Sequence, residues 1–152
     1  MDQTLFRYCP NCNSASFHQV SFKEYVCRTC RFNYFVNVAT AVAALLIWQD
    51  HLLLSIRKYP PAKGMLDLPC GFVDPCETAE EGLKRELQEE LDLEVNHLHY
   101  LCSYPNRYEY NGVCYHTLDL FYQKAFMHKP VLHPRDDITD ARWVKTTHID
   151  FE

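Results

Sequence analysis

The chain has 152 residues, of which 47% are hydrophobic and 23% charged, and a formal net charge of −5 at pH 7. This is enough apolar material for one substantial core, and the acidic balance argues against nonspecific binding of a polyanion as the main role. The longest apolar run, residues 38 to 48, is about eleven residues long and therefore too short to span a bilayer.

Two C-x-x-C pairs near the N-terminus, Cys9 with Cys12 and Cys27 with Cys30, are separated by residues 13 to 26. Two tight turns at this spacing can present four thiolates tetrahedrally to a structural Zn²⁺. Disulfides are the alternative, but residues 1–10 lack the apolar core of an export signal, so we expect a cytoplasmic protein and a zinc site. Four further cysteines lack such spacing and are expected to be buried or incidental thiols: Cys70, Cys76, Cys102 and Cys114.

The region around these cysteines is short. Residues 17–26 predict a hairpin and residues 34–38 lead out of it. Roughly the first 35 residues are too few to fold alone without a metal clip. We therefore expect a zinc ribbon over residues 1–36, followed by a second domain over residues 37–152.

The next stretch predicts the centre of a sheet. Residues 39–48 and 51–57 predict two strands that turn at Gln49-Asp50, and both are apolar enough to be buried on two faces. The prolines and glycine that follow mark a surface loop: Pro60, Pro61 and Gly64.

A helix is predicted from Ala79. Thr78 and Glu81 form a capping box that can satisfy two free backbone N–H groups at its start. The residues that recur every four positions give the helix a buried stripe: Ala79, Leu83, Leu87 and Leu91.

The same helix carries three carboxylates on one patch, Glu86, Glu89 and Glu90. Their repulsion costs a few tenths of a kcal/mol per pair, and a divalent cation would reverse its sign. Arg85 can reach Glu81 or Glu89 at four-residue spacing. A solvated helix face rich in Glu is the alternative interpretation of this pattern.

The C-terminal third predicts a long hairpin. Residues 98–110 and 113–126 are expected to pair across Asn111-Gly112, a strong hairpin signal. Residues 141–144 predict a last short strand, and a final helix is expected to begin near Thr146 or Thr147.

The stretch from Gly71 to Leu93 resembles the signature of the Nudix hydrolases. That signature is a Gly, five residues, a Glu, seven residues, and then Arg-Glu-apolar-x-Glu-Glu-x-Gly-apolar. The residues in register are Gly71, Glu77, Arg85, Glu86, Leu87, Glu89, Glu90 and Leu93, with Asp92 in place of the second Gly. The resemblance implies an α+β Nudix fold, a mixed β-sheet sandwiched between α-helices, preceded here by the zinc ribbon.

By this resemblance the chain is a metal-dependent pyrophosphohydrolase. Glu86, Glu89 and Glu90 are implied to bind Mg²⁺ or Mn²⁺ together with the carbonyl of Gly71, while Glu77 and Arg85 brace the loop against the helix. The cation would polarise a diphosphate and lower the pKa of a bound water that attacks phosphorus in line. The base for that water is left open among the helix glutamates and three loop acids: Glu109, Asp136 and Asp137.

Cys70 and Cys76 stand where the family usually has glycine. A residue other than glycine at positive φ costs about 1–2 kcal/mol, so the loop either avoids the left-handed conformation at these positions or carries strain. Asp92 is better suited to its position, because Asp tolerates that conformation at a helix end.

A zinc ribbon before a Nudix domain resembles the NADH pyrophosphatases and a shorter group thought to act on FAD or ADP-ribose. We expect a substrate of the FAD, ADP-ribose or NADH class. The NADH enzymes carry Ser-Gln-Pro-Trp after the helix, where this chain has Ser103-Tyr104-Pro105-Asn106, and the loss of the Gln and Trp weakens the case for NADH within that class. Arg57 or Arg107 could bind a phosphate. Four tyrosines could stack on a base or flavin, although tyrosines on adjacent strands more often only pair across the sheet: Tyr104, Tyr108, Tyr110 and Tyr115.

The alternative function is a nucleotide-sensing or RNA-binding regulatory protein in which the ribbon contacts the nucleic acid. The basic residues of the ribbon are few, namely Arg7, Lys23, Arg28 and Arg31. A sensor would also have no need of three helix carboxylates. We therefore expect a small nucleotide substrate and no membrane contact, with nucleic acid the less favoured partner. The ribbon is equally compatible with a homodimer or with a lid.

Overall fold

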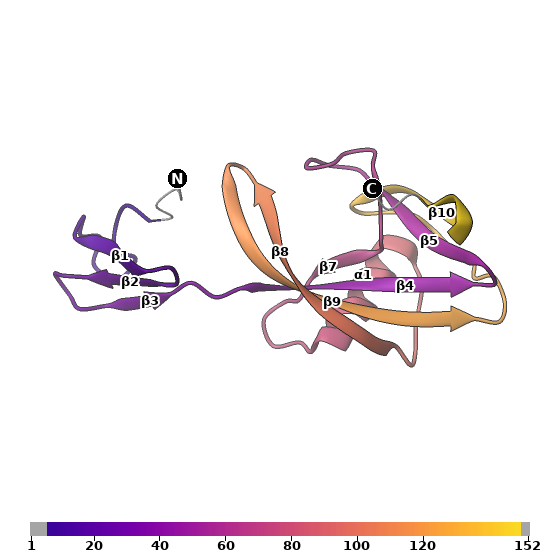
Figure 1. The fold of residues 1–152 in the computed structure, drawn as a ribbon, viewed down its shortest axis with the longest axis horizontal. Coiled ribbons are helices and arrows are strands. Elements are labelled where there is room, and N and C mark those ends of the chain that lie inside the picture. The colour runs from indigo at the N-terminus through magenta and orange to yellow at the C-terminus, as the bar shows by residue number, and fades with distance from the viewer. Residues whose placement is uncertain (1–5, 150–152) are drawn as a thin grey trace.

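The structure, a computed structural model, describes residues 6–149, and its strands form two separate sheets joined by an extended segment (Figure 1). The smaller sheet is antiparallel, in the order β1-β2-β3. Its strands are β1 (Phe17–Ser21), β2 (Glu24–Cys27) and β3 (Asn33–Phe35). The predicted hairpin over residues 17–26 is confirmed, and the segment expected only to lead out of it contributes a third strand.

Aromatic rings form a small core under this sheet. Phe17 and Tyr25 are buried, and Phe6 packs edge-on against both, with ring centroids 5.9 and 5.3 Å away. Two of the four paired cysteines, Cys9 and Cys27, belong to the same buried cluster. The small core and the cysteines therefore form one packed unit.

The larger sheet is mixed and has seven strands. Its main order is β10-β5-β4-β9-β8, with β4 and β9 parallel and the other pairs antiparallel. The strands are β4 (Ala39–Trp48), β5 (His51–Arg57), β6 (Leu66–Asp67), β7 (Cys70–Phe72), β8 (His99–Tyr110), β9 (Val113–Phe126) and β10 (Ile138–Lys145). The bounds predicted for the strands of residues 39–48, 51–57 and 113–126 are confirmed.

Strands β4 and β5 pair only beside their turn, at Ile47 with Leu52 and Trp48 with His51. Beyond that point they diverge, and the short strands between them fill the opening. β7 pairs with the first half of β4, and β6 pairs with the end of β5. This split brings Gly71 to the middle of the fold, opposite Val42.

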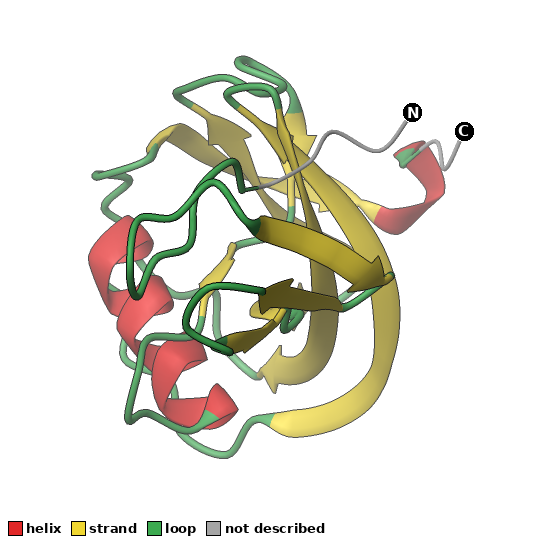
Figure 2. Ribbon diagram, turned by 90° about the vertical axis from the view of Figure 1, so that its left-hand side faces the viewer, coloured by secondary structure: helices red, strands yellow, loops and turns green. Residues whose placement is uncertain are grey.

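The helix α1 (Ala79–Leu91) packs along one side of the curled sheet (Figure 2). Its predicted start and capping box are confirmed: Thr78 Oγ1 accepts from the N–H of Glu81, and the Glu81 carboxylate accepts from the N–H of Thr78. The predicted stripe is also confirmed. Its three leucines are fully buried against residues of β4 and β5: Leu83, Leu87 and Leu91 against Val42, Ala44, Leu46 and Leu53.

The hairpin of β8 and β9 bends away from the rest of the sheet (Figure 1). Its turn is the predicted one, because Asn111 and Gly112 both have positive φ, at 49° and 76°. The closing pair is Tyr110 with Val113. Tyrosines of both strands of the hairpin lie beside Ala39, the first residue of β4.

The expectation of a sheet sandwiched between helices is wrong for residues 6–149, which contain one α-helix. Where a final helix was expected, there is a three-residue 3₁₀ turn, η1 (Thr146–His148). Residues 127–137 also form no helix and consist of bends, irregular backbone and a turn, consistent with Pro130 and Pro134, which disfavour a helix. The last strand is longer than predicted and covers Ile138–Lys145. Over the described residues, no helix has the length and apolar character needed to cross a membrane.

Candidate functional site

Arg85 lies at the centre of the loop that leads into α1. Its Nη2 is 2.7 Å from Glu77 Oε1, and its Nε is 3.2 Å from Glu77 Oε2, which is the bidentate geometry that makes arginine–carboxylate pairs strong. Nη2 also donates to the carbonyl of Phe72 at 2.9 Å. The arginine holds the pKa of Glu77 below its usual range. Glu77 and Arg85 thus tie the loop to the helix.

Two glycines allow this close packing. A Cβ at Gly71 would overlap the carboxylate of Glu86, and a Cβ at Gly82 would lie 2.8 Å from Glu77 Oε1. Gly82 therefore stands in the helix interior because the carboxylate of Glu77 lies against it. Gly71 leaves space for Glu86 to approach the backbone of β7.

The three helix carboxylates divide between two environments. Nη1 of Arg85 donates to Glu86 at 2.8 Å and to Glu89 at 3.0 Å. Of its two expected partners at four-residue spacing, Arg85 therefore contacts Glu89, while Glu81 serves the capping box. Burial raises the pKa of Glu86, and the guanidinium of Arg85 partly offsets that effect.

Glu90 lies one turn further along the helix and is buried in the protein. It is 6% exposed, and its buried Oε2 has no hydrogen-bond partner. Burial, followed by the nearby acids Glu86, Asp137, Asp67 and Asp136, raises its pKa to about 8. A buried carboxylate without a partner is costly, and a bound divalent cation is the group that would offset this cost.

The acids and arginines considered as the base or as phosphate ligands lie in different parts of the structure. Asp136 and Asp137 lie close enough to Glu90 for their charges to act on it, whereas Glu109 is on the hairpin with Cys114 as its cross-strand neighbour. Arg57 donates to Asp67 at 2.9 Å and to the carbonyl of Pro61 at 3.0 Å. Arg107 donates to Cys114 Sγ at 3.4 Å. Arg107 directly precedes Tyr108 in β8, so its side chain lies on the opposite face of the hairpin from that of Tyr108.

A hollow of about 250 Å³ lies beside β7 and is lined by Ala39, Phe72, Tyr108, Tyr110 and Tyr115. Tyr108 and Tyr110 are stacked at an interplanar angle of 13°, and Phe72 meets Tyr108 edge-on at 5.7 Å. Tyr108 and Tyr115 are also direct cross-strand partners. The tyrosines therefore pair across the sheet and at the same time wall a hollow. Tyr104 is 67% exposed and does not line it.

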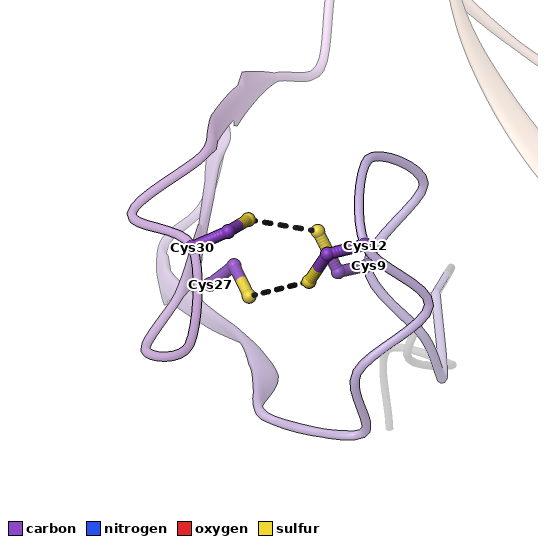
Figure 3. A group of neighbouring side chains, drawn as sticks. All are labelled: Cys9, Cys12, Cys27 and Cys30. Carbon is purple, nitrogen blue, oxygen red and sulfur yellow. Dashed lines mark hydrogen bonds between the residues drawn. The ribbon is translucent and has the colours of Figure 1, made fainter.

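The four paired cysteines come together in one cluster (Figure 3). Their sulfurs all lie within 4.8 Å of one another, and Cys9–Cys30 and Cys12–Cys27 are 3.7 and 3.6 Å apart. A tetrahedron with Zn–S bonds of about 2.3 Å has S···S edges of about 3.8 Å. A disulfide would need about 2.05 Å. The thiols thus have the spacing of metal ligands.

Two equivalent turns produce this spacing. After each C-x-x-C pair, the next residue is left-handed, Asn13 at φ 56° and Arg31 at φ 61°. The N–H of Asn13 donates to the carbonyl of Cys9 at 2.8 Å, and that of Arg31 to the carbonyl of Cys27 at 2.9 Å. The Asn11 amide donates to Cys30 Sγ at 3.6 Å and lowers the pKa of that thiol to about 6, whereas the pKa of Cys12 in the same cluster is raised to about 12.

The departures from the glycine pattern have different outcomes. Cys76 does adopt the left-handed conformation, with φ 72°, so this position carries the expected strain. Cys70 does not have positive φ and therefore avoids it. Asp92 closes the helix at φ 54°, as expected for a residue that tolerates this conformation.

The sequence reasoning did not single out Asp67 or Phe72. Asp67 accepts from Arg57 and from the N–H of Leu68, and its charge acts on Glu90. Phe72 walls the tyrosine hollow and offers its carbonyl to Arg85. Its position directly after Gly71 could have indicated from the sequence that Phe72 lies near the site. Asp67 had no such signal, because only the pairing of β6 with β5 brings it near the helix.

The sequence profile of the NUDIX domain family matches residues 38–151 of this chain. Among curated proteins, the chain is 26% identical over 137 residues to the NAD-capped RNA hydrolase NudC of Photorhabdus laumondii, covering 90% of this chain and 51% of that protein. It is 26% identical over 140 residues to the protein of the same name from Pseudomonas fluorescens, covering 90% of this chain and 47% of that one. The chain thus spans about half the length of the curated relatives it matches.

Three solved structures share the fold. A NUDIX hydrolase from Nitrosomonas europaea matches with a TM-score of 0.70 and 20% identity, covering 95% of this chain and 80% of that one. The NUDIX domain of Shewanella oneidensis NrtR, complexed with ADP ribose, matches with a TM-score of 0.64 and 22% identity, covering 74% and 76%. A bifunctional NMN adenylyltransferase/ADP ribose pyrophosphatase from Francisella tularensis, complexed with AMP and a Mn ion, matches with a TM-score of 0.60 and 29% identity, covering 74% and 35%.

Proposed function

This chain belongs to the NUDIX domain family, and from that premise we propose that it hydrolyses the pyrophosphate bond of a nucleoside diphosphate linked to a second moiety. The observation that carries the proposal is the buried, unpartnered carboxylate of Glu90 beside Glu86, where Gly71 leaves the space open. A solvated acidic face, the other interpretation of the helix, would not bury a carboxylate in this way.

The residues that would hold the divalent metal are Glu86, Glu89, Glu90 and the carbonyl of Gly71. Hard carboxylate and carbonyl oxygens are the ligands that Mg²⁺ and Mn²⁺ prefer. When bound, the metal supplies polarisation of the diphosphate and a water of lowered pKa. Arg85 and Glu77 hold the loop and the helix in register, so that Gly71 stays opposite Glu86. For the base, proximity to Glu90 favours Asp136 or Asp137 over Glu109.

The second moiety of the substrate is proposed to lie in the hollow of Phe72, Tyr108, Tyr110 and Tyr115. Phe72 directly follows Gly71 in β7, so the hollow begins one residue along the strand from the proposed metal site, on the face opposite the one that Glu86 approaches. Aromatic walls favour a planar group such as a base, nicotinamide or flavin. This supports substrates of the FAD, ADP-ribose or NADH class, and the names of the relatives add NAD-capped RNA to the set to be tested.

We propose that the four clustered cysteines hold a structural Zn²⁺, which leaves no position open for substrate. This role suits a small unit whose core is a few aromatic rings. The sensing or RNA-binding alternative is the less favoured one, because the curated relatives that match carry the name of a hydrolase.

The test is a panel of NADH, FAD, ADP-ribose, diadenosine polyphosphates, nucleoside triphosphates and a short NAD-capped RNA with Mg²⁺ or Mn²⁺. Products are identified by mass spectrometry. We expect cleavage of one dinucleotide-type substrate into two monophosphates. A Tyr108→Ala variant should raise KM for that substrate more than for a nucleoside triphosphate. No turnover on any member by a protein that binds Mn²⁺ would refute the proposal.

A further inference from the structure

The segment between β9 and β10 closes the C-terminal end of α1. The last four carbonyls of a helix have no partner within it. Here the N–H of His133 donates to the carbonyl of Leu91, and the N–H of Arg135 donates to that of Glu90, both at 2.9 Å. The segment therefore satisfies two of these carbonyls through its backbone.

The side chain of Arg135 satisfies a third carbonyl and adds a second donor to that of Gln88, which also accepts from the N–H of Asp92 at 3.1 Å. Its Nε donates to the carbonyl of Glu89 at 3.0 Å, and its Nη2 donates to that of Gln88 at 2.8 Å. Nη2 also pairs with Asp92 at 2.9 Å. A cation at a helix C-terminus is favourable, and the planar fork of arginine can reach several acceptors at once. Arg135 is thus bonded to the backbone of both Glu89 and Glu90.

The residues directly after Arg135 lie at the same end of the helix. Asp136 is left-handed at φ 57°, so the chain turns immediately after the N–H of Arg135 binds the carbonyl of Glu90. Lys58, just after β5, holds Asp136 and Asp137 from the other side. Its N–H donates to the carbonyl of Asp137 at 2.9 Å, and its Nζ donates to that of Asp136 at 2.8 Å. The two aspartates are therefore clamped between α1 and the end of β5.

We propose that Arg135 is a positioning residue for the hydrolysis. It fixes the distance between the helix carboxylates and the pair Asp136–Asp137, so that both sets reach one metal–diphosphate centre. The inference rests on the proposed function of the site, but it concerns a residue outside the helix and outside the signature. Arg135 itself touches neither metal nor substrate.

A merely structural cap is the competing account, and the geometry allows the two to be separated. The side chain of Arg135 is 50% exposed, so water can replace its bonds to the helix carbonyls when it is removed. The fold should therefore survive the loss of Arg135, while the relative placement of the two acid sets should not. Arg142 provides a matched control, because it is exposed and pairs with Asp140 at 2.9 Å on β10.

The experiment compares Arg135→Gln, Arg135→Lys and the control Arg142→Gln. Binding of Mn²⁺ is measured by calorimetry without substrate, kcat and KM are measured on the preferred substrate, and stability is followed by thermal unfolding. We expect Arg135→Gln to weaken Mn²⁺ binding and to lower kcat by roughly 10- to 100-fold, as for other outer groups that orient metal ligands. KM and the unfolding temperature should change little. Arg135→Lys should recover only part of the loss, because lysine keeps the charge without the fork.

Equal Mn²⁺ affinity and kcat in Arg135→Gln and Arg142→Gln would overturn the inference. A second result would also overturn it, namely a loss of kcat that disappears at a lower temperature, where the variant is as folded as the wild type. Arg135 would then act only by stabilising the helix end. If the wild type binds Mn²⁺ but cleaves no diphosphate, the proposed function fails. The difference in Mn²⁺ affinity between the two variants still decides whether Arg135 positions the acids.

Discussion

The side chains of the cysteine cluster lie close together in this chain, whereas those of the acid cluster are divided between different partners. The four sulfurs already lie within 4.8 Å of one another. The carboxylates are divided, with Glu86 and Glu89 on Arg85 and Glu90 buried without a partner for one oxygen. Two short backbone turns set the first arrangement, whereas contacts between distant parts of the chain set the second. This difference is the one expected between the structural metal site and the catalytic metal site that we propose.

The largest expected effect tests the acid cluster. Glu89→Gln or Glu90→Gln should lower kcat by more than the roughly 10- to 100-fold typical of outer groups at metal sites, because each removes a proposed ligand charge. The unfolding temperature should remain near that of the wild type. Steady-state kinetics and thermal unfolding of both variants check this. Near-normal activity in both would remove the site assignment.

Next, Cys12→Ser should abolish binding of the proposed structural Zn²⁺ by the four-cysteine cluster. One ligand of a four-thiolate site is lost, and the small aromatic core around Phe17 and Tyr25 is too little to hold the unit together. Metal analysis and hydrogen exchange over residues 6–36 measure the result. Cys102→Ser, outside the cluster, is the control and should keep its zinc. Unchanged zinc content in Cys12→Ser would contradict a four-thiolate site.

The titration of Glu90 provides a third comparison. Its pKa is raised to about 8 by burial and by the neighbouring acids, from the ordinary 4.5. The folded state therefore keeps a proton that the unfolded state releases. In a metal chelator, the free energy of unfolding should fall as pH rises from about 4.5 to about 8. Adding Mg²⁺ should stabilise the protein more at pH 8 than at pH 5.

Denaturant titrations across this pH range measure how the free energy of unfolding changes with pH in the wild type and in Glu90→Gln. Because other groups also titrate, the difference between the two proteins isolates Glu90. The free energy of unfolding of the wild type minus that of Glu90→Gln should decrease as pH rises. A wild type that gains stability relative to Glu90→Gln over the same range would show that Glu90 is ionised in the metal-free protein.

The smallest expected effect concerns Cys76, which stands at φ 72° in the loop before α1. Cys76→Gly should stabilise the protein by about 1 kcal/mol, since relief of the left-handed strain exceeds the added chain entropy of glycine. Cys102→Gly, in strand β8, is the matched control and should destabilise. Denaturant midpoints measure both changes. A destabilised Cys76→Gly would mean that contacts of the thiol outweigh the strain.

The sequence by itself determined the features that depend on near neighbours in the chain. The capping box of Thr78 and Glu81 fixed the start of α1, and Asn111-Gly112 fixed the turn of the long hairpin. The spacing of the cysteine pairs predicted their cluster, because each C-x-x-C turn closes on itself through one backbone hydrogen bond. The signature over residues 71–93 likewise indicated the family.

Only the tertiary structure decided which acids face one another. Asp67 on β6 and Asp136–Asp137 before β10 act on Glu90 because two strands and the end of α1 bring them together, across up to 70 residues of chain. Phe72 and Tyr108 meet over a hollow because the long hairpin bends. The sequence pattern predicted α1 but not that it would be the only α-helix of the described residues, where residues 133–135 use their donors to close α1 instead of forming a helix of their own. Periodicity reports which face of an element is buried, but not which distant element buries it.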